Sequence, residues 1–303
     1  MANINNTVAL PFIPEIWANT ALEVLRANIV LAPLVTKDSD VASFTVGSKL
    51  HIPYPGTFVA NDKATNTPVT KQTPTSTDTT VTLNKHKEVT FLIEDFTRAQ
   101  ANPVAMQAYM QAAIPPLAEQ VETDLFALYS SFTGSVGTSG TDLSAAAIRA
   151  VNKKFTDNKI VRGNRNIVIS TKDTAALLAD SSLQQFFAFN EGARGDVTTG
   201  LVTDNLYGVR IHESQLVPVV AGTPNSTKNL ALDPGAIIMA VRSLPDAPAG
   251  TGAAQAVVKD PVSGLVLRVT LSYSADNLGV QCTTDILYGV AKLRDEKGFT
   301  VLS

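Results

Sequence analysis

Residues 61–80 read NDKATNTPVTKQTPTSTDTT, a stretch with eight threonines and only two weakly apolar side chains, Ala64 and Val69. Its four charges cancel, and Pro68 and Pro74 interrupt both helices and strand ladders. Such a stretch cannot bury itself. Loops longer than about 12–15 residues in compact domains are usually functional or linkers. The flanking sequence therefore decides its role.

The flanks alternate between apolar and polar residues, which is the period-two pattern of a strand with one buried face. The apolar residues take even positions before the stretch and odd positions after it: Phe44, Val46, Leu50, Ile52 and Tyr54, then Val81, Leu83, Val89, Phe91 and Ile93. We expect two long strands that pair as a β-hairpin arm with a polar tip. Because an isolated two-stranded hairpin is marginal in water, the outer half of this arm needs a partner surface.

Composition limits the function classes. The 303 residues carry 24 Lys and Arg against 27 Asp and Glu, without a basic cluster, which argues against sequence-independent binding to nucleic acid. The single Cys282 excludes an intrachain disulfide framework. We find no signal peptide and no stretch near the ~20 apolar residues that span a bilayer. We expect a soluble protein that folds in a cytoplasm and has no membrane partner.

Two further segments flank the hairpin region. Residues 8–17, VALPFIPEIW, are apolar and bounded by prolines, and they predict an arm that lies on another surface. After the hairpin, a long helical region is expected over roughly 95–132, with a break at Pro115 and Pro116. Beyond this break an apolar stripe recurs at helical spacing, formed by Leu117, Val121, Leu125, Leu128 and Phe132.

The remaining sequence changes from α/β to β character. Residues 134–142 predict a flexible glycine and serine linker, followed by a helix with Ile148, Val151 and Phe155 on one face. A buried strand, RNIVIS, leads into a helix capped by Ser170 and Asp173. Residues 182–202 predict a long loop, and GVRIHESQLVP a strand after it. From about residue 255 we expect a hairpin and then strands in QCTTDILYGVAKL and GFTVLS.

Few side chains are placed for chemistry. His51, His86 and His212 lie in separate segments, and no His or Cys stands at metal-ligand spacing from another. Cys282 is expected to be a small buried strand residue. The sequence offers no nucleophile with a base, no paired catalytic carboxylates and no cofactor loop. We therefore predict no catalytic residue, no cofactor and no metal, and a protein that is not an enzyme.

Glu94, Asp95 and Arg98 form the densest charge cluster, at the joint between the hairpin and the long helix. The simpler interpretation is the start of the helix, since carboxylates are stabilised near the positive end of the helix dipole. The alternative is an ion pair across a subunit boundary.

Taken in order, these segments resemble the major capsid protein of tailed bacteriophages, the Hong Kong ninety-seven fold. FLIEDFTRAQ (91–100), LAEQVETDLFALY (117–129), GVRIHESQLVP (208–218) and DILYGVAKL (285–293) look like their counterparts in that family. The resemblance implies an α+β fold with an N-terminal arm (1–40) and a hairpin called the E-loop (41–94). It also implies a peripheral domain that combines a long spine helix (95–133) with a sheet (255–303), and an axial α/β domain (134–254).

The function that this resemblance implies is structural. Subunits would self-assemble through pentamers and hexamers into an icosahedral shell that encloses packaged double-stranded DNA without sequence-specific binding. The protein would be made in the cytoplasm of a bacterial host and would end in the virion capsid. Its implied partners are further copies, a separate scaffolding protein, a portal protein and, as an optional component, a cement protein. The alternative is a phage tail or surface binding module that docks through the hairpin arm.

The resemblance also implies which side chains meet a neighbouring subunit. We expect the interface to include Phe12, Trp17, Tyr54, Lys63, Thr65, Lys71, Thr75, Asp78, Glu94, Asp95 and Arg98. Some relatives cross-link a lysine of the E-loop to an asparagine of a neighbour. Lys63 and Lys71 lie in the corresponding segment, but no motif locates the asparagine or an activating acid, so the cross-link is not inferred.

Overall fold

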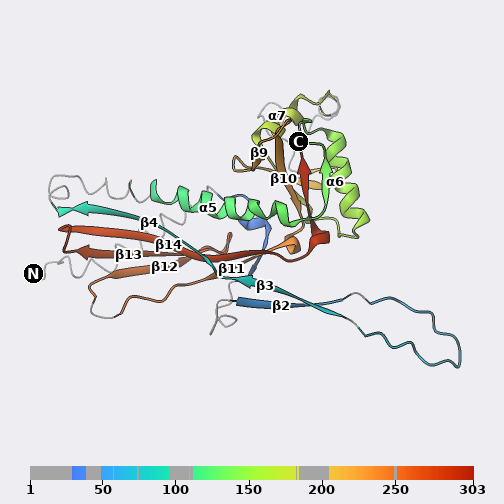
Figure 1. The fold of residues 1–303 in the computed structure, drawn as a ribbon, viewed down its shortest axis with the longest axis horizontal. Helices are drawn as coiled ribbons and strands as arrows, with labels where there is room; N and C mark the ends of the chain where they lie inside the picture. Colours follow the sequence, from blue (N-terminus) through green and yellow to red (C-terminus); the bar gives the residue numbers. More distant parts are fainter. Residues whose placement is uncertain are drawn as a thin grey trace, which may run out of the picture.

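The computed structural model describes residues 29–38, 49–56, 58–73, 75–95, 109, 112–181, 183, 205–248 and 251–303. Figure 1 shows three parts: a long sheet with helix α5 along one face, a second sheet flanked by helices α6 and α7, and a two-stranded hairpin that projects away from both. The predicted α+β class is confirmed.

The first sheet has six strands in the order β1-β11-β14-β13-β12, with β4 also paired to β14. The long strand β14 organises it, because its first residues lie between β4 and β13 and its last residues pair with β11. The predicted late hairpin is confirmed as β12 and β13. The bounds of the six strands are Thr36–Asp38 (β1), Lys85–Glu94 (β4), Ile237–Arg242 (β11), Ala254–Lys259 (β12), Val266–Ser274 (β13) and Gly279–Lys292 (β14).

Helix α5 (Pro115–Phe126) covers one face of this sheet, and a 3-10 turn, η3 (Ala127–Ser131), follows it. The helix starts at a proline, whose missing N–H would have no helical partner in any case. Leu117, Val121 and Leu125 are at most 2% exposed and join the main apolar core, which confirms this part of the predicted stripe. The α-helix ends before the rest of the stripe: Leu128 lies in η3, and Phe132 is extended. Most of the predicted helix before Pro115 lies outside the described residues.

The second sheet has seven strands in the order β5-β15-β10-β6-β8-β7, with β9 also paired to β10. Helices α6 (Ala145–Asp157) and α7 (Thr171–Ala179) flank it, and the predicted apolar face of α6 is fully buried. The hydroxyl of Ser170 accepts a hydrogen bond from the Asp173 N–H at 3.2 Å, which confirms the predicted cap. The bounds of the strands are Ser135–Gly137 (β5), Asn166–Ile169 (β6), Asn205–Leu206 (β7), Val209–Glu213 (β8), Val219–Val220 (β9), Ser226–Leu232 (β10) and Gly298–Leu302 (β15).

Three strands correct the sequence-based expectation. Residues 85–94 were expected in the hairpin, but as β4 they pair with β14 in the first sheet. Residues 135–137, in the predicted flexible linker, form β5 beside β15. β15 was expected with residues 255–303 in the peripheral sheet, but it lies between β5 and β10 in the second sheet. Alternation predicts which face of a strand is buried, and it does not identify the neighbouring strand.

The chain passes between the two sheets three times in the described ranges, from η3 to β5, from β10 to β11 and from β14 to β15. The last two connections contain short 3-10 turns, η4 (Pro234–Ala236) and η5 (Asp295–Lys297). Side chains join the connections to one another: Lys297 Nζ lies 2.8 Å from Asp233 Oδ1, and the Thr133 N–H donates to Asp295 Oδ1 at 3.1 Å. The three connections therefore form one cross-bonded joint.

Candidate assembly surface

The hairpin is held to the body at its base by a small apolar cluster. β2 (Lys49–Pro55) pairs antiparallel with β3 (Ser76–Thr82). Leu50 and Val81 are buried in this cluster together with Ile238 and Ala240 of β11. Gly289 of β14 permits the close approach, since a Cβ there would lie 2.2 Å from the Thr82 carbonyl oxygen. The base is fixed, and the far end projects away from both sheets (Figure 1).

Tyr54, a predicted interface residue, contacts its own chain. The guanidinium carbon of Arg294 lies 3.9 Å from the centre of the Tyr54 ring, in cation–π geometry. Tyr54 is near the outer end of β2, and Arg294 follows β14. The contact therefore sets the direction of the hairpin relative to the first sheet. No sequence pattern links residues so far apart in the chain.

Asp78, another predicted interface residue, forms a pair across the hairpin. Its Oδ2 atom lies 2.6 Å from Nδ1 of His51. The side chains of His51 and Asp78 are 61% and 49% exposed, so solvent screens the pair and its effect on stability is small. Its main effect is to align the two strands.

The tip between the two strands carries four further predicted interface residues, Lys63, Thr65, Lys71 and Thr75, all exposed. Lys63 Nζ donates to the Ala64 carbonyl at 2.7 Å, and Thr65 lies in the turn at this point. The Thr75 carbonyl accepts the Gly56 N–H at 2.7 Å, at the neck of the tip. These bonds are local, so the tip is shaped by its own backbone and presents its side chains outward.

Three exposed apolar side chains of the tip were not among the predicted interface residues. Phe58, Val59 and Val69 are exposed by 67%, 67% and 66%. The Gln72 side chain bonds both backbone groups of Val59: its Oε1 accepts the N–H at 2.9 Å, and its Nε2 donates to the carbonyl. This bridge joins the two limbs beside the apolar residues. In the sequence, two adjacent apolar residues, Phe58 and Val59, lie just before the polar stretch and could have indicated this exposed apolar surface.

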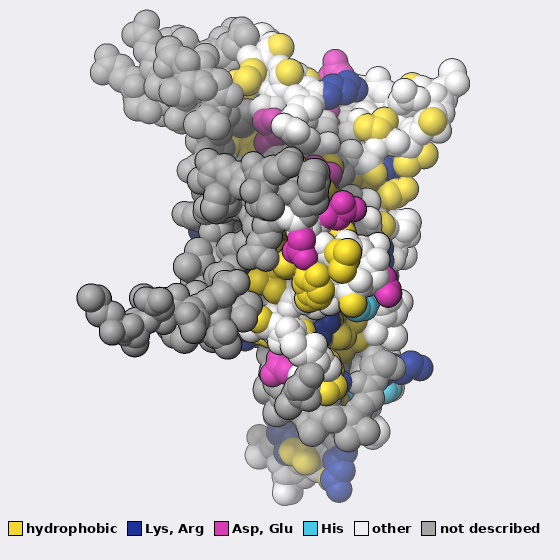
Figure 2. All heavy atoms as spheres, turned by 90° about the vertical axis from the view of Figure 1, so that its left-hand side faces the viewer, with side chains coloured by type: hydrophobic (Ala, Val, Ile, Leu, Met, Phe, Trp, Pro, Cys, Tyr) yellow, Lys and Arg dark blue, Asp and Glu magenta, His cyan; other side chains and the backbone are white. Residues whose placement is uncertain are grey.

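Glu94 and Asp95 lie at the far end of the first sheet, beside the turn between β13 and β14. The Asp95 N–H donates to the Leu278 carbonyl at 2.9 Å, and its carboxylate accepts from the Tyr273 hydroxyl at 2.8 Å. This bond raises the pKa of Tyr273. Leu278 is 64% exposed at a φ of 44°, a left-handed conformation that is uncommon for leucine. Figure 2, seen from this end, shows acidic side chains next to hydrophobic ones.

The predicted interface residues Phe12, Trp17 and Arg98 lie outside the described residues. Their role, including an ion pair of Arg98 across a subunit boundary, stays a prediction. Glu94 and Asp95 do sit next to the start of the predicted long helix, because Glu94 ends strand β4 and Asp95 is helical.

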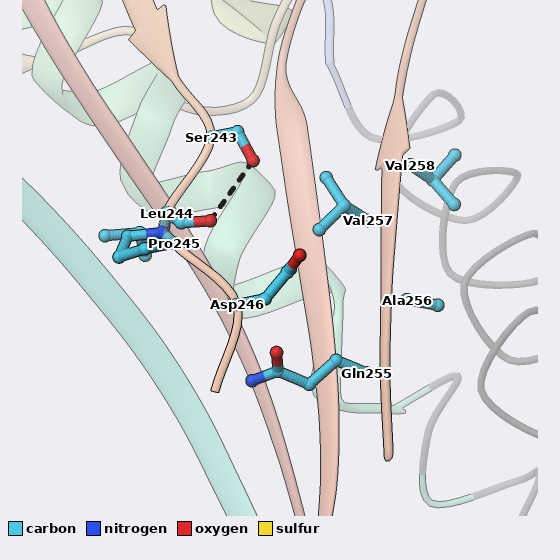
Figure 3. A pocket seen from close by; sticks show the side chains of 8 residues that line it. All are labelled: Ser243, Leu244, Pro245, Asp246, Gln255, Ala256, Val257 and Val258. Atoms are coloured by element: carbon cyan, nitrogen blue, oxygen red, sulfur yellow. Dashed lines mark hydrogen bonds between the residues drawn. The ribbon is translucent and has the colours of Figure 1, made fainter. Parts of the chain in front are cut away.

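A separate open pocket of about 700 Å³ lies beside strand β12, lined by residues 243–246 and 255–258. Figure 3 shows Gln255 and Val257 pointing from β12 toward loop 243–246, whereas Ala256 and Val258 point to the other side. Among the lining residues Asp246 carries the single charge. The pocket thus lacks the paired groups that acid–base or nucleophilic catalysis requires.

Cys282 behaves as a buried strand residue. Burial raises the pKa of its thiol to about 12, so the thiol stays protonated and weakly nucleophilic at neutral pH. In the part of the chain that the structure describes, no three His, Cys, Asp or Glu side chains form a group that could hold a metal ion. The helices described there are also too short or too polar to cross a membrane.

Comparison with known proteins identifies the fold. No family model and no curated protein sequence matches the chain. A structure from Mycobacterium phage Che8 matches with a TM-score of 0.65 at 18% identity, over 90% of each chain. The capsid of cyanophage P-SCSP1u matches with a TM-score of 0.65 at 13% identity, over 90% of this chain and 87% of that chain. The head structure of Helicobacter pylori bacteriophage KHP40 matches with a TM-score of 0.62 at 12% identity, over 92% and 90%. Across nearly its whole length the chain therefore has the fold of phage capsid proteins, the Hong Kong ninety-seven type that its sequence resembles.

Proposed function

We propose that this protein is the structural subunit of an icosahedral phage capsid, which self-assembles through pentamers and hexamers into the shell around packaged double-stranded DNA. The observation that carries this proposal is the anchored hairpin, whose tip carries exposed apolar side chains and projects away from both sheets of its own chain (Figure 1). The shared fold with several phage capsids supports the same role.

The hairpin tip would lie on a neighbouring subunit. Phe58, Val59 and Val69 supply exposed apolar surface, and Lys63, Thr65, Lys71 and Thr75 supply exposed polar groups, two kinds of surface that interfaces combine. The Arg294–Tyr54 contact and the apolar cluster at the base hold the arm in a set direction, so less ordering is required when it docks. Phe12 and Trp17, and the group of Glu94, Asp95 and Arg98, would add further contacts.

In such a shell, residues 1–40 would form the N-terminal arm and the hairpin the E-loop. The six-stranded sheet with α5 would form the peripheral domain, and the seven-stranded sheet with α6 and α7 the axial domain. This division assigns β4 to the peripheral and β15 to the axial domain. Scaffolding, portal and cement proteins are the expected partners, and assembly in the host cytoplasm is the expected route. The net charge of −3 suits a container that holds DNA without binding it tightly.

The alternative, a phage tail or surface module that docks through the same arm, is not favoured, because the structural neighbours are capsids. A structural rather than an enzymatic role also agrees with the single charge in the pocket beside β12 and with the protonated Cys282 thiol.

Electron microscopy of the expressed full-length chain tests the proposal. Negative-stain images with and without a candidate scaffolding protein should show closed shells of uniform size in at least one condition. Size-exclusion chromatography should show capsomers as intermediates. A chain that remains a folded monomer in both conditions, as judged by circular dichroism and light scattering, would overturn the proposal.

A further inference from the structure

Helix α5 carries a fully buried acid, Glu122, on the side that packs against residues 29–35. Its Oε1 atom accepts hydrogen bonds from three consecutive backbone N–H groups, those of Val30 (3.0 Å), Leu31 (2.7 Å) and Ala32 (3.2 Å). These groups precede or begin the turn η1 (Ala32–Leu34), where the backbone lacks partners of its own. One carboxyl oxygen therefore fixes the backbone at the point where the N-terminal part of the chain meets the helix.

The other oxygen, Oε2, is buried and has no hydrogen-bond partner in the described part of the chain. Residues 29–35, IVLAPLV, contain no ionisable side chain. From β4 and β14, the groups Lys85, Lys87 and Tyr288 act instead on Asp124, which accepts from Lys85 Nζ at 2.8 Å and from Tyr288 Oη at 2.5 Å. Turn η3 contributes only Tyr129 as a titratable group, and Glu119 on α5 is exposed. Three N–H dipoles face Glu122, and among the residues that the structure describes no full positive charge compensates it.

We propose that Glu122 is a proton-controlled anchor, which holds residues 29–35 on α5 tightly when its carboxyl is neutral and loosely when it is ionised. An ionised carboxylate at this site is a buried charge with one unpartnered oxygen, and such a charge is costly. If residues 29–35 leave the helix, water reaches the carboxylate and removes this cost. The undocked state therefore favours the ionised form, and the docked state favours the neutral one.

The acidity of the group agrees with this geometry. Burial raises the pKa of Glu122 from its ordinary value of 4.5 to about 7, and the three N–H bonds lower it by less. The docked state thus holds a proton that the undocked state releases between about pH 4.5 and pH 7. The stability that this proton adds to the docked state is fully present below pH 4.5 and is lost as the pH rises through 7.

Hydrogen–deuterium exchange of the full-length chain tests the anchor. The protection of a peptide that covers residues 29–35, corrected for intrinsic exchange rates, should rise about 10- to 30-fold between pH 7.5 and pH 5.5. In Glu122→Gln the amide keeps an acceptor oxygen without a charge, so the protection should vary by less than about twofold over this range. Glu119→Gln, on the exposed side of the same helix, is the matched control and should keep the wild-type dependence.

The comparison peptide is strand β10 (Ser226–Leu232) in the second sheet, whose protection should not follow Glu122. If protection of residues 29–35 in the wild type fails to rise on acidification, or rises equally in β10, the anchor does not exist. A Glu122→Gln variant that keeps the full pH dependence would also rule out the anchor. The wild-type series is decisive even if that variant does not fold. Because no shell is needed, the result is independent of the proposed capsid function.

Discussion

The guanidinium group of Arg294 lies over the ring of Tyr54, with its central carbon 3.9 Å from the ring centre. Arg294 follows the longest strand of the first sheet, and Tyr54 is near the outer end of the first hairpin strand. The two residues thus connect the rigid part of the subunit to the arm that projects from it. In a capsid, the direction of this arm would decide which neighbouring surface it can reach.

We expect Arg294→Ala to remove one of the contacts that hold the hairpin to the first sheet, at a small cost in stability. A cation–π contact of this kind contributes about 0.5–1 kcal/mol at a partly exposed site. A double-mutant cycle of Arg294→Ala with Tyr54→Leu, measured by chemical denaturation, should give a coupling energy in this range. Arg294→Lys, which keeps the charge, should retain part of it. Additive effects of the two substitutions would show that the contact does not hold the arm.

Replacing an apolar side chain of the tip should impair assembly and leave the subunit stable. Val59→Ser removes apolar surface that is already 67% exposed in the subunit, so the melting temperature should change little. If the tip lies on a neighbour, the yield of shells at a given concentration should fall at least about tenfold, since a buried interface anchor contributes roughly 2 kcal/mol. Val161→Ser, at an 81% exposed position just after α6, is the matched control. Equal shell yields for both variants would place the tip outside the interface.

Leu125 should be essential for the main core. Its side chain is fully buried between α5 and the first sheet, so Leu125→Ala should lower the free energy of unfolding by about 2–5 kcal/mol. Leu128, in the following turn η3 and only partly buried, is the control, and its truncation should cost less than half as much. Urea denaturation of both variants at one oligomeric state measures this difference. Similar losses would indicate that burial along the stripe does not follow the structure.

Removing the charge of Asp285 should lower the stability of the fold. Its 3% exposed carboxylate accepts from Arg268 Nε at 3.0 Å and from Nη2 at 2.5 Å, and His86 Nε2 lies 2.9 Å away. Asp285→Asn would leave the partly buried Arg268 without its counter-charge, at a cost of about 3 kcal/mol. The exposed pair of Lys153 and Asp157 provides the contrast: Asp157→Asn should change stability by less than about 0.5 kcal/mol. Thermal melts at pH 7.5 distinguish the two cases.

Patterns within a segment predicted much of this fold, and relations between distant segments escaped prediction. The alternation around residues 50–54 and 85–94 correctly indicated strands, and the spacing of Leu117, Val121 and Leu125 correctly indicated a buried helical face. The same alternation could not show that residues 85–94 leave the hairpin for β14, because either partner buries the same face.

At the candidate surface, too, local patterns were predictable and contacts between distant segments were not. The polar tip was predicted from composition, yet the exposed apolar residues Phe58 and Val59 were overlooked because they lie just outside the threonine-rich stretch. The sequence did indicate that Glu122 could be buried, because this acid directly follows Val121 of the buried stripe. Its three N–H partners come from a segment about 90 residues earlier, and no pattern in the helix points to them.

In the proposed shell around packaged DNA, the joint between the two sheets would carry a mechanical load. A force that pulls the sheets apart would be shared by the three covalent connections that cross between them in the described part of the chain. Any twist of one sheet against the other would also strain the bonds between Lys297 and Asp233 and between Thr133 and Asp295. These bonds therefore resist rotation of one sheet against the other. In the proposed shell, the subunit should therefore yield first at its contacts with neighbouring subunits and last at this joint.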